Sequence, residues 1–298
     1  MNTAEPIFGR MIPAMVTPFD VDLKLDVERT RNLVDFLVDG GSDSILVCGT
    51  TGESPTLTTA EKLLLFETVI DQVAGRVPVI ANVGSNNTAG SIELGLEAKK
   101  LGAQGIMAVV PYYNKPPQEG LYQHFKAIAE EVDLPTVVYN IPGRCSVNMT
   151  AETTLRLAHD VEQIVYVKEA SGDINQMAEI CEGAPEGFCV LSGDDSMTLP
   201  LMEKGGHGVI STAGNVVPKK MKELVDLCAA GDWDAARAAH EALMPIMKGL
   251  FVVTNPILTK QALNLIGVPV GGLRLPLIEA TPDQTRDLEA VLKEVGVL

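Results

Sequence analysis

The stretch Ile164-Val-Tyr-Val-Lys-Glu-Ala-Ser171 decides the fold class, because a short β-rich apolar run ends there on a charged pair. Nearly continuous runs of β-branched and aromatic residues are typical of strands buried on both faces, and such strands occur in parallel sheets covered by helices. We therefore predict a buried parallel strand at residues 164–167, with Lys168 at its carboxyl end.

Seven further runs of the same kind lie along the chain, and helical patterns separate them. These runs are Met11–Val16, Ser44–Val47, Pro78–Ala81, Gly105–Val110, Pro135–Tyr139, Phe188–Leu191 and Gly208–Ile210. Eight strands that alternate with helices predict an α/β fold of the (β/α)8 TIM barrel type. An open doubly wound sheet is the alternative, but it favours a Gly-x-Gly-x-x-Gly turn after the first strand, and residues 15–20 carry none.

The last part of the chain has helical patterns without strands between them, at residues 232–250, 255–266 and 282–297. A barrel reaches 200–250 residues as one unit, so the length of 298 residues does not require a second catalytic domain. We predict a (β/α)8 catalytic barrel over residues 1–230 and a C-terminal helical extension over residues 231–298.

The charge balance excludes some function classes. The chain has 39 acidic and 23 basic residues, for a net charge of −16, whereas nucleic-acid binding needs clustered cations. No apolar run approaches the ~20 residues that span a bilayer, and residues 1–10 do not read as a signal peptide, so we expect a cytoplasmic protein. Five cysteines without a Cys-x-x-Cys pair and four isolated histidines indicate no metal site.

Lys168 is the most unusual polar residue at a predicted strand end. Burial disfavours an ammonium and lowers its pKa, and the neutral amine can attack a carbonyl carbon to form a Schiff base. The alternative is a structural ion pair, with Glu169 as the nearest candidate partner. In a barrel of this type the chemistry lies at the carboxyl ends of the strands, which favours looking for partners of Lys168 there.

Two polar residues lie at and just after the end of the neighbouring fifth strand. Tyr139 is expected one strand from Lys168, where a phenol can relay protons, and Arg144 can hold a carboxylate with its planar fork. Taken singly, a buried tyrosine is more often a packing residue and an exposed arginine more often a solvated charge.

Two other strand ends carry turns with polar groups. Gly49-Thr-Thr-Gly-Glu-Ser54 predicts a tight turn whose hydroxyl and N–H groups suit a small carboxylate, although most such turns bind nothing. Pro111-Tyr-Tyr-Asn-Lys-Pro116 predicts a stiff projecting loop, for which surface packing or a subunit contact is the alternative.

These motifs occur in one order and each falls at a predicted strand end. Together with Tyr139-Asn-Ile-Pro-Gly-Arg144 and Val167-Lys-Glu-Ala-Ser171, they make the chain similar to the dihydrodipicolinate synthase branch of the N-acetylneuraminate lyase superfamily. The resemblance runs from about Gly9 to the C-terminus without a large insertion.

The resemblance implies a reaction and a set of partners. Lys168 would form a Schiff base with pyruvate, and the enamine would add to L-aspartate 4-semialdehyde in the diaminopimelate route to lysine, with no external cofactor. Tyr139 would relay protons, and Thr51 would link it to Tyr113 of a neighbouring subunit. The family is usually a tetramer built as a dimer of dimers.

The resemblance also implies residues that hold the substrates. Thr50 and Thr51 would hold the pyruvate carboxylate, and Arg144 would meet the carboxylate of the semialdehyde. Gly193 and Ile210 match backbone positions that line the family's pocket.

One departure concerns feedback inhibition by lysine. Positions of the family's lysine site that match are Ser54, Asn86 and Tyr112. Thr59 and Lys62 stand where lysine-inhibited members carry histidines, and Gly90 stands where they carry a glutamate. Loss of an acid and gain of a cation disfavour a cationic ligand, so this allosteric site is expected to be degenerate.

Two other functions remain open from the sequence. Another pyruvate-dependent class I aldolase, a 2-keto-3-deoxy sugar acid lyase or N-acetylneuraminate lyase, would use the same Lys168 and Tyr139. A non-catalytic metabolite-binding barrel is disfavoured, because the set of reactive residues is intact.

Overall fold

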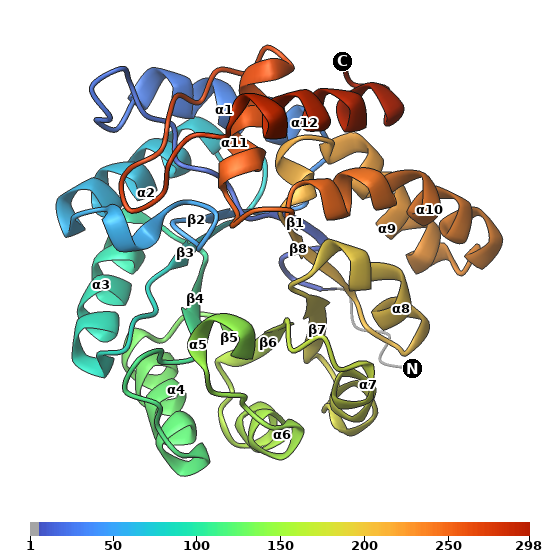
Figure 1. The fold of residues 1–298 in the computed structure, drawn as a ribbon. Helices are drawn as coiled ribbons and strands as arrows, with labels where there is room; N and C mark the ends of the chain where they lie inside the picture. The colour runs from blue at the N-terminus through green and yellow to red at the C-terminus, as the bar shows by residue number, and fades with distance from the viewer. Residues whose placement is uncertain (1–5) are drawn as a thin grey trace. The chain divides into compact units, whose positions relative to one another are not determined.

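The computed structural model describes residues 6–298, and its strands and helices alternate along most of the chain (Figure 1). The strands are β1 (Met11–Pro13), β2 (Ile45–Val47), β3 (Val79–Asn82), β4 (Gly105–Val109), β5 (Thr136–Asn140), β6 (Ile164–Glu169), β7 (Cys189–Ser192) and β8 (Gly208–Ser211). The helices are α1 (Val27–Asp39), α2 (Thr59–Val73), α3 (Thr88–Leu101), α4 (Gln118–Val132), α5 (Pro142–Cys145), α6 (Ala151–Asp160), α7 (Ile174–Gly183), α8 (Thr198–Glu203), α9 (Pro218–Ala230), α10 (Trp233–Gly249), α11 (Ile257–Leu265) and α12 (Pro282–Glu294).

The eight strands form one sheet in the order β1-β8-β7-β6-β5-β4-β3-β2. The ladders from β3 to β8 are parallel, and a parallel bridge between Ala14 and Leu46 joins the two ends of this order. An open doubly wound sheet has two unpaired edges, so this bridge decides between the two predicted architectures. The (β/α)8 barrel fold is confirmed.

The predicted strands are all present, with small differences at their ends. β1 stops at Pro13, because beyond it only an isolated bridge continues the pairing. β6 continues to Glu169, because Lys168 and Glu169 pair with β5 on one side and β7 on the other. Lys168 therefore lies within a strand that is paired on both edges, not in the loop that follows it.

Contacts within the chain divide it into two compact units. The first comprises residues 6–10 and 80–210, and in Figure 1 its helices α3, α4, α6 and α7 lie on one side of strands β4–β7. The second comprises residues 11–79 and 211–298, and it contains β1, β2, α1, α2 and α9–α12. Strands and helices alternate up to the end of α9 at Ala230, and only helices follow it. Residue 230 as a domain boundary stays a prediction.

Local sequence signals explain where several helices begin. The Thr58 hydroxyl accepts from the Glu61 N–H and the Glu61 carboxylate accepts from the Thr58 N–H, which makes a capping box at the start of α2. The three predicted C-terminal helices are present as α10, α11 and α12. Helix α5 was not predicted, and Pro142 at its first position, where the missing N–H costs nothing, helps start it. Within residues 6–298, no helix has the length and apolarity needed to cross a membrane.

Candidate active site

Lys168 lies in the middle of the first unit's sheet. Its partners in the neighbouring strands are Tyr139 of β5 and Leu191 of β7. The side chain is buried, and its Nζ atom lies 4.3 Å from the centroid of the Tyr139 ring. Tyr139 is itself buried at 3% exposure. The two residues that the sequence placed on adjacent strands are therefore side by side.

Burial determines the protonation of Lys168. Desolvation lowers the pKa of the amine from 10.5 to about 7, the carboxylate of Asp195 opposes this effect, and the Arg144 guanidinium adds to it. Asp195 is buried in the turn after β7. A substantial fraction of the amine is thus neutral near pH 7, which is the state that can attack a carbonyl carbon.

We expect the rate of imine formation with pyruvate to rise with pH up to about 7 and to level off above it. The neutral amine is the reactive form, and it gains population as pH rises through the lowered pKa. Borohydride trapping in single-turnover experiments at a series of pH values measures this rate. A rate that keeps rising to about pH 10, as for an ordinary lysine, would contradict the assignment.

Glu169, the ion-pair partner considered for Lys168, is engaged by neutral donors. Its carboxylate accepts from Asn140 Nδ2 at 3.0 and 3.2 Å, from the Ser171 N–H at 2.7 Å and from Gln176 Nε2 at 3.2 Å. Burial raises the pKa of Glu169, and these hydrogen bonds oppose that rise. This network joins the ends of β5 and β6 and so holds Tyr139 and Lys168 in register. Asn140 was missed from the sequence, although its position directly after Tyr139 at a strand end was a signal.

Gly193 packs directly against Lys168. A Cβ atom at residue 193 would lie 3.1 Å from Cγ and from Cε of Lys168 and 2.7 Å from the Ala170 Cβ. The Gly193 N–H donates to the Glu169 carbonyl at 2.8 Å. Glycine is therefore favoured here by space, because a Cβ atom would force Ala170 to move and would press on the lysine side chain. Ile210 of β8 is buried at 1% exposure, within the first unit.

The remaining predicted residues of the first unit lie on exposed segments. Tyr113 has a φ of 73° and is 90% exposed, and Tyr112 beside it is exposed at 39%. Asn114 Nδ2 donates to the Asn86 carbonyl at 3.0 Å, which ties this loop to the one after β3. Arg144 is exposed on α5, close enough to Lys168 for its charge to act on that amine.

The threonine turn belongs to the second unit. The Gly52, Glu53 and Ser54 N–H groups donate to carbonyls of Gly49 and Thr50, so these three donors close the turn itself. Thr51 is buried and Thr50 is half-buried. The hydroxyls of these threonines, rather than the whole set of N–H groups, are what the turn offers to a ligand.

Sequence reasoning missed the partners of this turn. Asn255 Nδ2 donates to Thr51 Oγ1 at 2.7 Å, and Lys260 Nζ pairs with the Glu53 carboxylate at 2.9 Å. Both come from the segment around α11, about 200 residues further along the chain. A lysine in the apolar pattern Ile257-Leu-Thr-Lys-Gln-Ala-Leu was the available signal.

A comparison with protein families agrees with this arrangement. The model of the dihydrodipicolinate synthetase family matches residues 7–295. The chain belongs to this family. Curated members that it resembles include the 4-hydroxy-tetrahydrodipicolinate synthase of Symbiobacterium thermophilum, 56% identical over 98% of this chain and 100% of that protein. The synthase of the same name from Bacillus subtilis is 47% identical over 97% of this chain and 99% of that protein.

Solved structures of the family superpose closely on this chain. Dihydrodipicolinate synthase from Aquifex aeolicus is 46% identical, with a TM-score of 0.95 over 97% of this chain and 99% of that one. The enzyme from Cyanidioschyzon merolae, solved with lysine bound, is 44% identical, with a TM-score of 0.97 over 99% of this chain and 100% of that one. The predicted family and fold are thus confirmed over nearly the whole length.

Proposed function

We propose that this chain is an aldolase-type lyase that condenses pyruvate with L-aspartate 4-semialdehyde to 4-hydroxy-tetrahydrodipicolinate, in the diaminopimelate route to lysine. The observation that carries the proposal is the buried amine of Lys168, with its pKa of about 7, in a member of this family. The amine adds to the ketone carbon of pyruvate and water leaves. Loss of a methyl proton gives an enamine, whose terminal carbon bonds to the aldehyde carbon, and cyclisation releases the product from the lysine.

The other roles in this proposal belong to residues around the imine. Tyr139, whose ring lies against the Lys168 amine, relays protons during imine formation. Thr51 supports this relay, and Thr50 and Thr51 hold the pyruvate carboxylate. Gly193 supports the proposal because it leaves room beside Lys168. We propose that the backbone of Ile210 also lines the substrate pocket.

Tyr113 is proposed to complete the relay in a neighbouring subunit. Its 90% exposure and its left-handed backbone support a side chain that projects away from its own subunit. From the resemblance to the family we also propose a homotetramer built as a dimer of dimers, and a cytoplasmic location.

The alternative function, lysis of 2-keto-3-deoxy sugar acids or of N-acetylneuraminate, would share Lys168 and Tyr139. Curated relatives at 47–56% identity over nearly the full length are 4-hydroxy-tetrahydrodipicolinate synthases. They support the synthase over the sugar-acid lyases.

The test is to trap the covalent intermediate. The protein is incubated with pyruvate, reduced with borohydride and digested, and the adduct is mapped by mass spectrometry. Attachment at Lys168, followed by product formation when the semialdehyde is added, is expected. Attachment at another residue would overturn the mechanism, and turnover of sugar acids in place of the semialdehyde would overturn the substrate assignment.

Replacing Arg144 with Ala is expected to impair use of the semialdehyde and to spare imine formation with pyruvate. A lost charge-assisted hydrogen bond to a carboxylate should raise the KM for the semialdehyde about 10- to 100-fold. Arg144→Lys is the matched control, because it keeps the charge without the bidentate fork. Steady-state kinetics with each substrate varied in turn measure the effect, and an unchanged KM for the semialdehyde would rule out this role.

Lysine is expected to inhibit this enzyme weakly or not at all. Gly90 lies in the first turn of α3, where the lysine-inhibited members carry an acid, and Lys62 adds a positive charge to the proposed site. An inhibition constant below about 1 mM, an affinity near −4 kcal/mol, would refute this expectation. Gly90→Glu should increase the sensitivity to lysine, and Gly90→Gln, which lacks the charge, should not.

A further inference from the structure

We propose that Asn255 is a positioning residue that sets the direction of the Thr51 hydroxyl. This inference rests on the proposed function of Thr51. Asn255 Nδ2 donates to Thr51 Oγ1 at 2.7 Å, and both side chains are buried, at 4% and 3% exposure. Asn255 lies just before α11 and is linked to the proposed relay through Thr51.

The direction follows from which groups can donate. An amide nitrogen only donates, so the Thr51 oxygen must accept in this contact. A hydroxyl has a single proton, and Thr51 therefore keeps that proton for another acceptor. A relay through Thr51 requires such a proton at a fixed position. Asn255 thus sets the direction in which the Thr51 hydroxyl donates its proton, and in this proposal it does so without contact with the substrate.

The amide of Asn255 is held at its other end. The Thr259 hydroxyl, one helical turn along α11, donates to Asn255 Oδ1 at 2.9 Å, and Thr259 is fully buried. Both ends of the amide are therefore engaged by buried side chains. A buried amide held in this way cannot rotate without losing two hydrogen bonds.

The backbone around Thr51 is fixed separately from its hydroxyl. The Thr17 hydroxyl donates to the Gly52 carbonyl at 2.6 Å, and Lys260 Nζ contacts both the Thr17 carbonyl and the Glu53 carboxylate at 2.9 Å. These contacts hold the turn on the C-terminal side of Thr51. Loss of the Asn255 amide should therefore affect the hydroxyl more than the turn.

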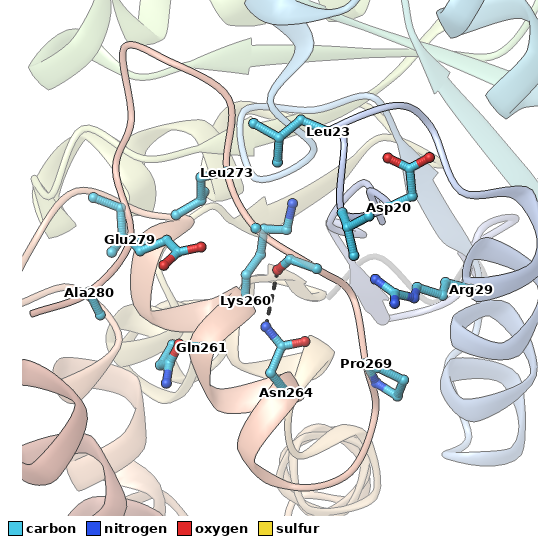
Figure 2. Close-up of a pocket in the computed structure, with 14 residues that line it drawn as sticks. Asp20, Leu23, Arg29, Lys260, Gln261, Asn264, Pro269, Leu273, Glu279 and Ala280 are labelled. Atoms are coloured by element: carbon cyan, nitrogen blue, oxygen red, sulfur yellow. Dashed lines mark hydrogen bonds between the residues drawn. The ribbon is translucent and has the colours of Figure 1, made fainter. Parts of the chain in front are cut away.

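The same helix provides a matched control. Gln261 and Asn264 lie on the side of α11 that lines a pocket of about 490 Å³, together with residues such as Asp20, Arg29 and Glu279 (Figure 2). Gln261→Glu makes the same amide-to-carboxylate change on this helix, away from the Thr51 hydroxyl. It should leave the activity unchanged.

The test is a double-mutant cycle with the full-length protein. Asn255→Asp keeps the shape of the side chain but replaces the donor by an acceptor, which should turn the Thr51 proton toward residue 255. We expect kcat to fall about 10- to 100-fold, with the KM for pyruvate within about threefold. In a Thr51→Val background, the same substitution should reduce kcat by less than about threefold, because no hydroxyl remains to be directed.

Each outcome decides the inference. An equal loss in both backgrounds would mean that Asn255 acts only on the fold, and a wild-type kcat for Asn255→Asp or for Thr51→Val would overturn the proposal directly. If Asn255→Asp fails to fold, Thr259→Val is the second variant, because it keeps the Asn255 donor but releases the other end of the amide. It should lower kcat where Thr51 is intact and not in the Thr51→Val background. Failure of wild-type protein to trap pyruvate on Lys168 would reject the proposed function, whereas trapping with an unaffected Asn255→Asp enzyme would reject this inference alone.

Discussion

Replacing Lys168 with Met is expected to abolish the reaction, with kcat falling by at least about 10⁴-fold. Methionine has a similar unbranched shape and fits beside Gly193, but it has no amine to form the imine. Borohydride trapping with pyruvate should yield no adduct in this variant. Residual trapping at wild-type stoichiometry would show that another amine carries the chemistry.

The same substitution should not destabilise the protein, which separates lost chemistry from lost folding. The folded-state pKa of Lys168 is about 7 and its ordinary value is 10.5, so the folded state disfavours the protonated amine. This cost is fully present below about pH 7 and declines as pH rises toward 10.5. Thermal unfolding of Lys168→Met should therefore occur at or above the wild-type Tm at pH 6, with a smaller difference at pH 9. A lower Tm at pH 6 would contradict this expectation.

Breaking the Lys260–Glu53 pair is expected to cause the largest loss of stability of any single change considered. The two side chains are 1% and 0% exposed and lie 2.9 Å apart. Removing one partner leaves the other buried charge without its ion-pair partner, which costs about 3–5 kcal/mol. Lys260→Met and Glu53→Gln should each lower the free energy of unfolding by this amount, measured by urea denaturation.

The double variant tests the physical reason. Burial lowers the pKa of Lys260 to about 8 in spite of the neighbouring Glu53 carboxylate, so desolvation outweighs the attraction between the two charges. Lys260→Met combined with Glu53→Gln should therefore be more stable than either single variant, because no lone charge remains buried. Gln at residue 53 can still accept from the Arg274 N–H, which lies 3.0 Å from the Glu53 carboxylate. A double variant as unstable as the sum of the singles would reject this explanation.

The strands could be predicted from the sequence because their signal is local. Runs such as Pro135–Tyr139 and Ile164–Val167 are apolar throughout, and the register that places Tyr139 beside Lys168 follows from two adjacent parallel strands. The charge on Lys168 at the end of such a run was also a local signal. Helix α5 was missed because its four residues are too few for a periodic pattern.

The contacts around the threonine turn could not be predicted, because they depend on residues far apart in the chain. Nothing near Asn255 indicates that its amide meets Thr51, which lies 204 residues earlier. Likewise, Glu169 was a reasonable ion-pair partner for Lys168 by adjacency alone. Successive residues of a strand point to opposite faces, however, and Glu169 contacts Asn140, its own partner on β5.

The partners of the turn at residues 49–54 also set when this turn can be anchored during protein synthesis. Asn255, Lys260 and Arg274 are made 204 to 221 residues after the groups they bind. At translation speeds of about 5–20 residues per second, these partners are made roughly 10 to 45 s after the turn. A nascent chain that already contains Lys168 therefore still lacks the residues that anchor the threonine turn, and these contacts can form only after the segment through Arg274 has been made.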